Sequence, residues 1–352
     1  MNSSQTNNIE KIKIILNLIG SPFNDSTNSV SSNPSDLYSV AQKNKIGLLF
    51  LESLSHKNII NGLEDELNKQ KKSYLDQRET VTRVAEVLSM IQCKYAIIKS
   101  NFPFPAVPND VDVLILGDDT EYDNAIKHML NNNFELIKSD PLEIFLHDAR
   151  RARHVDPKIK ESFDVDVYKE VGASHIVYMN KRKLANQISE TTINGTKVNV
   201  FKPAVEMALS IFHSIFPERI YTLLLHFYIL HTIKQMKASD KDEFLLTCRN
   251  HKISNAVLAT LRLTERIQEI CFRESPADVT DLREALGKKE HIEICKIPYH
   301  YPMKLILNSF LAKRGDLAFS YSALCQLISI INPKTAHYII LEYVKRKNRD
   351  TY

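Results

Sequence analysis

The stretch Asp110-Val111-Asp112-Val113-Leu114-Ile115, near the first third of the chain, alternates acidic and apolar residues. A period of two is typical of a β-strand, in which residues i and i+2 lie on the same face of the sheet. We therefore expect Asp110 and Asp112 on one face and the two valines on the other, where they enter a core. The stretch predicts a strand that presents paired carboxylates.

A second stretch, ESFDVDVY at residues 161–168, repeats the pattern with Asp164 and Asp166 on a shared face. If the two strands are neighbours, several carboxylates converge, and each carboxylate raises the pKa of the next. Divalent cations relieve that repulsion, because Mg²⁺ prefers oxygen ligands and completes its shell with waters and substrate phosphates. Paired acidic strands are therefore a candidate site for metal-assisted phosphoryl transfer.

The chain around these strands divides into three regions by its hydrophobic periodicity. Residues 1–92 carry apolar residues at helical spacing, whereas strand patterns concentrate in residues 93–201. Residues 202–352 are helical again, with Pro203 suited to a first helical turn. The sequence thus predicts an α+β fold, in which a helical N-terminal segment and a helical C-terminal domain flank a small mixed β-sheet core.

The individual elements follow from the same periodicity and from turn residues such as Asn194-Gly195, which suits a tight hairpin. Strands are expected over residues 95–98, 110–115, 134–137, 143–146 and 161–168, and in a hairpin over 191–200. Helices are expected over residues 9–19, 36–54, 62–92, 123–133, 218–237, 240–250, 253–272, 302–312, 315–331 and 334–347, and from Pro203 onward.

Composition excludes several classes of protein. The 352 residues suit two or three packed units, and 43% hydrophobic and 25% charged residues argue against wholesale disorder. The net charge of +4 does not by itself predict a nucleic-acid partner. Only 8 residues are glycine, and neither G-x-G-x-x-G nor G-x-x-x-x-G-K-[ST] occurs. A nucleotide, if one binds, must have its phosphates held without a glycine-rich loop.

Cysteine usage and the absence of targeting patterns bear on the compartment. The 5 cysteines are dispersed without a C-x-x-C pair, which argues against a zinc site or a redox dithiol. The N-terminal stretch has no signal-peptide pattern, and the apolar runs are too short to span a bilayer. We expect a cytoplasmic protein with no membrane partner.

The order of these elements resembles the nucleotidyltransferase superfamily typified by DNA polymerase beta. Its pattern is h-G-[GS], then [DE]-h-[DE]-h, then h-[DE]-h. Here Ile97-Ile98-Lys99-Ser100 precedes the first acidic pair, and Asp166 lies in the later strand. Residues 165–172 and 201–206 are similar to an uncharacterised prokaryotic nucleotidyltransferase family within that superfamily. The resemblance covers about residues 35–235.

The resemblance implies transfer of a nucleoside monophosphate from an NTP to a hydroxyl acceptor by two-metal catalysis, with Mg²⁺ or Mn²⁺. It implies that Asp110, Asp112 and Asp166 are the catalytic residues and the metal ligands, with Asp164 as the rival third ligand. Ser100 would meet the nucleotide phosphates. The acceptor, an RNA, a small molecule or a protein, is left open.

Lys99 stands where the resembling family has glycine. Either Lys99 supplies positive charge to the nucleotide phosphates, or the site is inactive and the chain is a nucleotidyltransferase-like module that binds a protein or nucleic-acid partner. A basic run that includes Arg151 and Arg153 is a second candidate for binding nucleotide phosphates or an RNA backbone. A solvated loop explains that run equally well.

Overall fold

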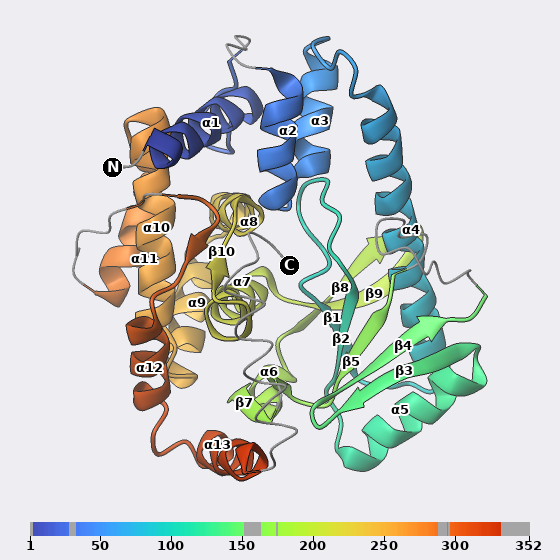
Figure 1. Ribbon diagram of the computed structural model, residues 1–352. Helices are drawn as coiled ribbons and strands as arrows, with labels where there is room; N and C mark the ends of the chain where they lie inside the picture. The colour runs from blue at the N-terminus through green and yellow to red at the C-terminus, as the bar shows by residue number, and fades with distance from the viewer. Residues whose placement is uncertain are drawn as a thin grey trace.

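The computed structural model of the chain describes residues 3–27, 33–150, 163–173, 175–287, 294 and 296–331. Over these residues the fold is α+β, as the sequence predicts: a mixed sheet lies beside a large helical body (Figure 1). None of the described helices is both long enough and apolar enough to cross a lipid bilayer.

A 7-stranded sheet forms the centre of the strand-rich region, in the order β3-β4-β5-β2-β1-β9-β8. The β2–β5 and β1–β9 pairs are parallel and the other pairs are antiparallel. The hairpin turn at Asn194-Gly195 is confirmed, with φ of 47° and 81°. The strands are β1 (Tyr95–Ile98), β2 (Val111–Ile115), β3 (Phe134–Asp140), β4 (Glu143–Asp148), β5 (Val165–Tyr168), β8 (Ile188–Ile193) and β9 (Thr196–Phe201).

Alternate residues of the central strands belong to two different hydrophobic cores. Val113 and Val165 pack with α4 (Glu64–Ser89) and α5 (Asp119–Asn131), which cover one face of the sheet. Leu114, on the opposite face of β2, joins the core of the helical body. The prediction that the valines enter a core is therefore confirmed, and the face that carries Asp112 is enclosed by helices as well.

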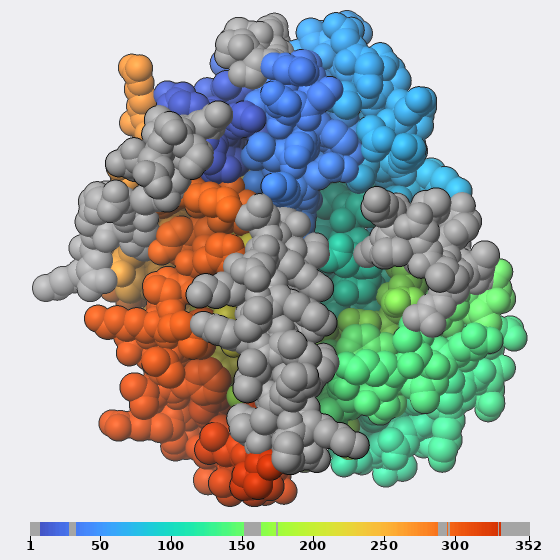
Figure 2. All heavy atoms as spheres, in the orientation of Figure 1, coloured from blue at the N-terminus to red at the C-terminus, as the bar shows by residue number. Residues whose placement is uncertain are grey.

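The helical body combines the first and the last parts of the chain. Its core contains residues of α1 (Ser3–Ile19), α2 (Pro34–Lys43) and α3 (Gly47–His56) together with residues of the C-terminal helices. In Figure 2 the blue N-terminal helices lie directly against both the orange C-terminal residues and the teal residues of the sheet region. The C-terminal helices are α7 (Pro203–His213), α8 (Leu223–Gln235), α9 (Ala238–Asn250), α10 (Ser254–Phe272), α11 (Ala277–Leu286), α12 (Met303–Ala312) and α13 (Leu317–Ile330).

The division at residues 1–92, 93–201 and 202–352 stays a prediction. The two hydrophobic cores do not follow these boundaries. Helix α4 of the N-terminal region packs on the sheet, whereas α1 of the same region packs against α10 of the C-terminal region.

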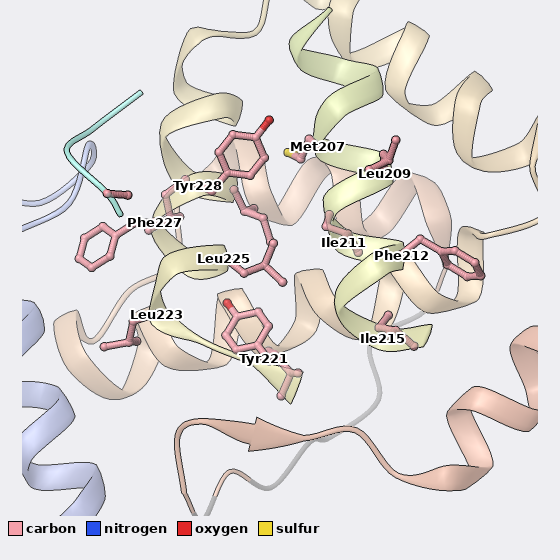
Figure 3. Close-up of a cluster of buried hydrophobic side chains, with 14 of the residues drawn as sticks. Met207, Leu209, Ile211, Phe212, Ile215, Tyr221, Leu223, Leu225, Phe227 and Tyr228 are labelled. Carbon is pink, nitrogen blue, oxygen red and sulfur yellow. The ribbon is translucent and has the colours of Figure 1, made fainter. Parts of the chain in front are cut away.

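Helices α7 and α8 form the part of this core that lies nearest the acidic face of the sheet. Figure 3 shows Met207 and Ile211 of α7 opposite Leu225 and Tyr228 of α8, and the four side chains are buried. The sequence of α7 is apolar on nearly every side, which suits a helix enclosed by neighbours. This packing fixes the wall that faces the carboxylates.

The expected helix over residues 36–54 is wrong in one respect, because it is two helices separated at Asn44–Ile46. Asn44 is buried, and its side-chain and main-chain oxygens accept hydrogen bonds from the backbone N–H groups of Leu223 (3.2 Å) and Leu224 (3.1 Å). These bonds satisfy N–H groups at the start of α8 that a helix cannot satisfy itself. A tertiary contact, which local periodicity does not report, therefore ends α2.

Several short elements are additions to the prediction. The expected helix over residues 218–237 begins later, at Leu223, and residues 334–347 lie outside the described residues. The added elements are β6 (Val171–Ala173), β7 (Ile176–Met179), α6 (Lys181–Leu184), the π-helix η1 (Ser214–Glu218), β10 (Ile220–Tyr221), α11 and β11 (Tyr299–His300).

A buried histidine makes the stability of the helical body depend on pH. His226 is fully buried, and its ring nitrogens contact the Tyr221 hydroxyl (2.9 Å) and the Gln268 amide (3.0 Å). Burial lowers the pKa of His226 to about 3. An unfolded histidine titrates near pH ~6.5, so the unfolded chain binds more protons below that pH. Stability is then lost as pH falls from about 6.5 towards 3.

We expect the wild type to lose about 2 kcal/mol more unfolding free energy than His226→Gln between pH 7 and pH 4.5. Urea unfolding at each pH measures the difference between the two proteins. The exposed His56 on α3 provides the control, and His56→Gln should keep the wild-type pH slope. Equal slopes for wild type and His226→Gln would contradict the assignment.

Candidate functional site

Asp112 and Asp166 lie side by side on the face of the sheet that meets the helical body. In the parallel β2–β5 pair, Asp112 is the direct register partner of Asp166. Both aspartates are buried, and neighbouring strands place their backbones roughly 4.8 Å apart. Asp110 precedes β2 by one residue and is partly exposed at the end of the β1–β2 connector. The expected convergence of the two acidic strands is thus present in the structure.

Asp164 does not join this pair. It precedes β5, its carbonyl accepts a hydrogen bond from the Val111 N–H (3.0 Å), and its carboxylate lies 3.5 Å from His147 Nδ1. The Asp164 side chain is 45% exposed, whereas Asp166 is 7% exposed. The register therefore places Asp166, and not its rival, opposite Asp112.

The burial and crowding of the carboxylates raise their pKa values. Burial, together with the charges of Asp110, Asp112 and Glu143, raises the pKa of Asp166 to about 9. Burial also raises the pKa of Asp112 to about 7, with Asp110 adding to the rise and Lys99 opposing it. Full ionisation of these carboxylates would exceed the positive charge of Lys99, so they hold protons that a bound cation could displace.

Glu143 is a further carboxylate that the sequence reasoning missed. It opens β4 and is the register partner of Tyr168 in β5, and burial raises its pKa. Residue 143 begins an expected strand, but the alternation within one strand does not tell which strands are neighbours. Glu143 could have been found only from the order of strands in the sheet.

Lys99 supplies the positive charge at the site. Its Nζ lies 3.1 Å from Asp112 Oδ2 and 5.0 Å from the centre of the Tyr168 ring. Burial alone would lower the pKa of Lys99, but the carboxylates of Asp112 and Asp110 raise it above its ordinary value. The ammonium group therefore stays charged against Asp112.

Lys99 also keeps the backbone conformation that glycine would favour at this position. Its φ of +53° is left-handed, a region that costs a residue with a Cβ roughly 1–2 kcal/mol. The turn after β1 is held in place by its neighbours: Glu206 Oε1 accepts from the Lys99 N–H (2.6 Å), and Gln77 Nε2 donates to the Ser100 carbonyl (3.1 Å). The backbone shape at the missing glycine is thus retained.

Ser100, the expected phosphate-binding hydroxyl, is buried at this turn. Its Oγ donates to the Ile98 carbonyl (3.0 Å) and accepts from the Asp112 N–H (3.3 Å). In this arrangement Ser100 ties the end of β1 to the start of β2. Its role towards a nucleotide stays a prediction, as does that of Lys99.

His213 and the π-helix η1 form the wall opposite the sheet. His213 Nε2 lies 3.4 Å from Lys99 Nζ, and its Nδ1 lies 2.8 Å from the Tyr178 hydroxyl. The His213 Nε2 atom also lies 3.8 Å from Glu218 Oε1, so the ring stands between the ammonium group, a carboxylate and the Tyr178 hydroxyl. Glu218, at the end of η1, lies 3.6 Å from Lys45 between α2 and α3. Short π-helical segments are frequent at functional sites.

A cleft of about 880 Å³, open solvent included, lies between the acidic face of β2 and this wall. The proline-rich connector forms one side, where Phe102 packs edge-on against Tyr228 (5.6 Å between ring centres). The lining residues are Lys45, Lys99, Phe102, Pro108, Asn109, Asp110, Asp112, Tyr168, Ser210, His213, Ser214, Glu218, Ile220, Thr222, Leu224, Leu225 and Tyr228. The cleft therefore combines carboxylates, two lysines and an apolar floor.

Within the described ranges, no group of three or more His, Cys, Asp or Glu side chains is arranged to hold a metal ion. A pair of carboxylates is nevertheless enough for Mg²⁺, which is commonly bound through one or two carboxylates, waters and substrate phosphates. Asp112 and Asp166 are the pair that fits this description. Arg151 and Arg153 lie outside the described residues, and Arg150 pairs with Asp148 (Nε–Oδ1 2.9 Å).

Comparisons with known proteins add little to this geometry. No protein-family model matches the chain, and no curated protein sequence matches it. Among solved structures, an antigenic nucleotidyltransferase-like protein from Paracoccidioides brasiliensis is similar, with a TM-score of 0.34 and 15% identity over 61% of this chain and 94% of that chain. At this degree of likeness, only the geometry of the site bears on function.

Removal of one crowded carboxylate should stabilise the protein when no cation is bound. Because the folded state raises the pKa of Asp166, the folded chain binds more protons than the unfolded chain between about pH 4 and pH 9. The stabilisation that the protonated Asp166 provides is complete below about pH 4, and it is lost progressively as pH rises from about 4 to about 9. We expect Asp166→Asn to gain up to about 4 kcal/mol of unfolding free energy on the wild type between pH 5 and pH 8.

Denaturant unfolding in EDTA, at both pH values, measures this gain. Asp164→Asn is the matched control, since Asp164 has the same chemistry and lies half exposed two residues away. It should shift stability by less than about 0.5 kcal/mol. A loss of stability in Asp166→Asn at pH 8 would show that the carboxylates do not repel one another.

Proposed function

We propose that this chain transfers a nucleoside monophosphate from an NTP to a hydroxyl acceptor, with Mg²⁺ or Mn²⁺ as the cation. The observation that carries the proposal is the parallel register of Asp112 with Asp166, a buried pair on the sheet face of which Asp112 lines the cleft. Carboxylates placed together at such a cost in repulsion are well suited to a cation that carries phosphates with it.

Each side chain has a distinct task in this proposal. Asp112 and Asp166 would hold the cation, with Asp110 at the mouth of the site. When bound, the cation would neutralise the phosphate oxygens and favour departure of pyrophosphate. The chain itself would position the nucleotide against the acceptor hydroxyl and exclude water, so that catalysis depends on placement and charge and not on covalent chemistry.

The nature of the acceptor is open within this proposal. The cleft presents Phe102 and Tyr228 beside polar groups such as Glu218 and Lys45. An RNA end, a small molecule and a protein side chain all offer a hydroxyl that could meet the nucleotide there. Arg151 and Arg153 would assist by binding phosphate, as basic side chains that precede the strand of Asp166.

A second candidate is a nucleotidyltransferase-like module that binds a protein or nucleic-acid partner without catalysis. The ion pair between Lys99 and Asp112 favours it, because one oxygen of the central carboxylate is already occupied by an ammonium group. In that case nucleotide binding would not depend on a divalent cation. Binding to RNA that weakens steeply with salt and needs no Mg²⁺ would support this second function.

Nucleotide binding in the presence and absence of Mg²⁺ tests the proposed function. We expect calorimetric titration with each of ATP, CTP, GTP and UTP to show binding of at least one nucleotide only when Mg²⁺ is present. Asp112→Asn and Asp166→Asn should each weaken that binding at least tenfold, because each removes a charged oxygen ligand. Asp119→Asn, which alters an exposed carboxylate paired with Lys169, should bind as the wild type does.

The two site variants are needed together, because they differ in stability. Asp112→Asn leaves the buried Lys99 ammonium without its ion-pair partner, which lowers the melting temperature. Asp166→Asn removes repulsion and stays folded. Nucleotide binding that survives unchanged in Asp166→Asn, or that is indifferent to Mg²⁺ in the wild type, would overturn the proposal.

A further inference from the structure

The ammonium group of Lys99 lies on one flank of Asp112, and Asp166 lies on the other. The sheet order β5-β2-β1 puts Asp166, Asp112 and the end of β1 in sequence across the sheet. Ile98 is the register partner of Asp112, so Lys99 directly follows the residue that pairs with it. Asp112 therefore faces a carboxylate on its β5 side and a fixed positive charge on its β1 side.

We propose that Lys99 Nζ takes the place of one cation of a two-cation centre, so that each chain binds a single divalent ion, between Asp112 and Asp166. This inference rests on the proposed function. It replaces the expectation of two-metal catalysis with a centre made of one divalent ion and one ammonium group.

Several contacts hold Lys99 in this place. Its side chain is only 14% exposed, and the ring of Tyr168 and His213 Nε2 enclose the ammonium group. Its backbone N–H is held by Glu206 from α7. The ammonium group cannot leave Asp112 without also losing its contacts with Tyr168 and His213, while the backbone of Lys99 stays held by Glu206. It behaves as a permanent component of the site.

The number of free oxygen ligands also fits one ion. Two ions in a phosphoryl-transfer centre lie roughly 3.5–4 Å apart and share a bridging carboxylate. Asp112 is central enough to bridge, but its Oδ2 is bound to Lys99. Across the described part of the chain, no set of three or more carboxylate, thiolate or imidazole ligands is gathered to hold an ion. What the pair can still offer an ion is the second oxygen of Asp112 and the carboxylate of Asp166, and Tyr168 also hydrogen-bonds to the Asp112 carboxylate.

The backbone conformation of Lys99 also supports the inference. A φ of +53° suits glycine, and a lysine there carries a steric cost. The cost is offset by an ammonium group that neutralises Asp112 and can donate to a phosphate or acceptor oxygen in the adjacent cleft.

Titration with Mn²⁺ alone, followed by calorimetry and by electron paramagnetic resonance, counts the ions. We expect one Mn²⁺ per wild-type chain and two in Lys99→Met, with the dipolar broadening of a close Mn²⁺ pair. Lys99→Gly, which suits the positive φ, should also bind two and keeps the test valid if the methionine variant is unstable. Lys99→Arg keeps the charge and should bind one.

Lys169→Met is the matched control, since the ion pair of Lys169 is with Asp119 and not with a carboxylate of the site. It should bind one ion. Two ions in the wild type, or one ion still in both Lys99→Met and Lys99→Gly, would overturn the inference and leave the proposed function standing. No ion in any of the proteins would also overturn the inference, and Mg²⁺-dependent nucleotide binding would then decide the proposed function separately. Ions that bind only after Lys99 is removed would show that Lys99 blocks the site, which contradicts both.

Discussion

The ion pair between Lys99 and Asp112 is the interaction on which the rest of the site depends. It lies where the two hydrophobic cores of the protein meet, and both partners are nearly buried. A buried carboxylate among other carboxylates is costly without compensation, and a buried ammonium group is costly too. Each charge compensates the other at a position that is largely shielded from solvent.

Both cores are needed to produce that position. The valine face of the sheet packs on α4 and α5, which fixes the register of β2 against β5 and thereby the meeting of Asp112 with Asp166. The opposite face meets α7, which supplies Glu206 to the backbone of Lys99 and His213 to its ammonium group. The acidic pair is thus set by the sheet, and the cation beside it is set by the helical body.

This division explains how much of the site the sequence could predict. The alternation of Asp112 with its valines is local, so the strand and its acidic face followed from a period of two. The choice of Asp166 over Asp164 could be settled only by inter-strand register, which is not a local property. Glu143, Glu206 and His213 come from distant segments, as does the break at Asn44 that ends α2. Periodicity carries no information on such contacts.

The position of Lys99 separates two properties that a glycine combines. A glycine in this turn supplies backbone freedom and leaves space for a ligand, and here the freedom is retained while the space is filled. The turn is held by hydrogen bonds from α4 and α7 that do not depend on the side chain at residue 99. A side chain could therefore enter this position without loss of the turn, and a lysine that reaches Asp112 recovers in charge neutralisation what it loses in backbone strain. Lys99, in place of the glycine of the resembling family, thus supplies part of the positive charge that the carboxylates need. A bound cation has to supply only the rest.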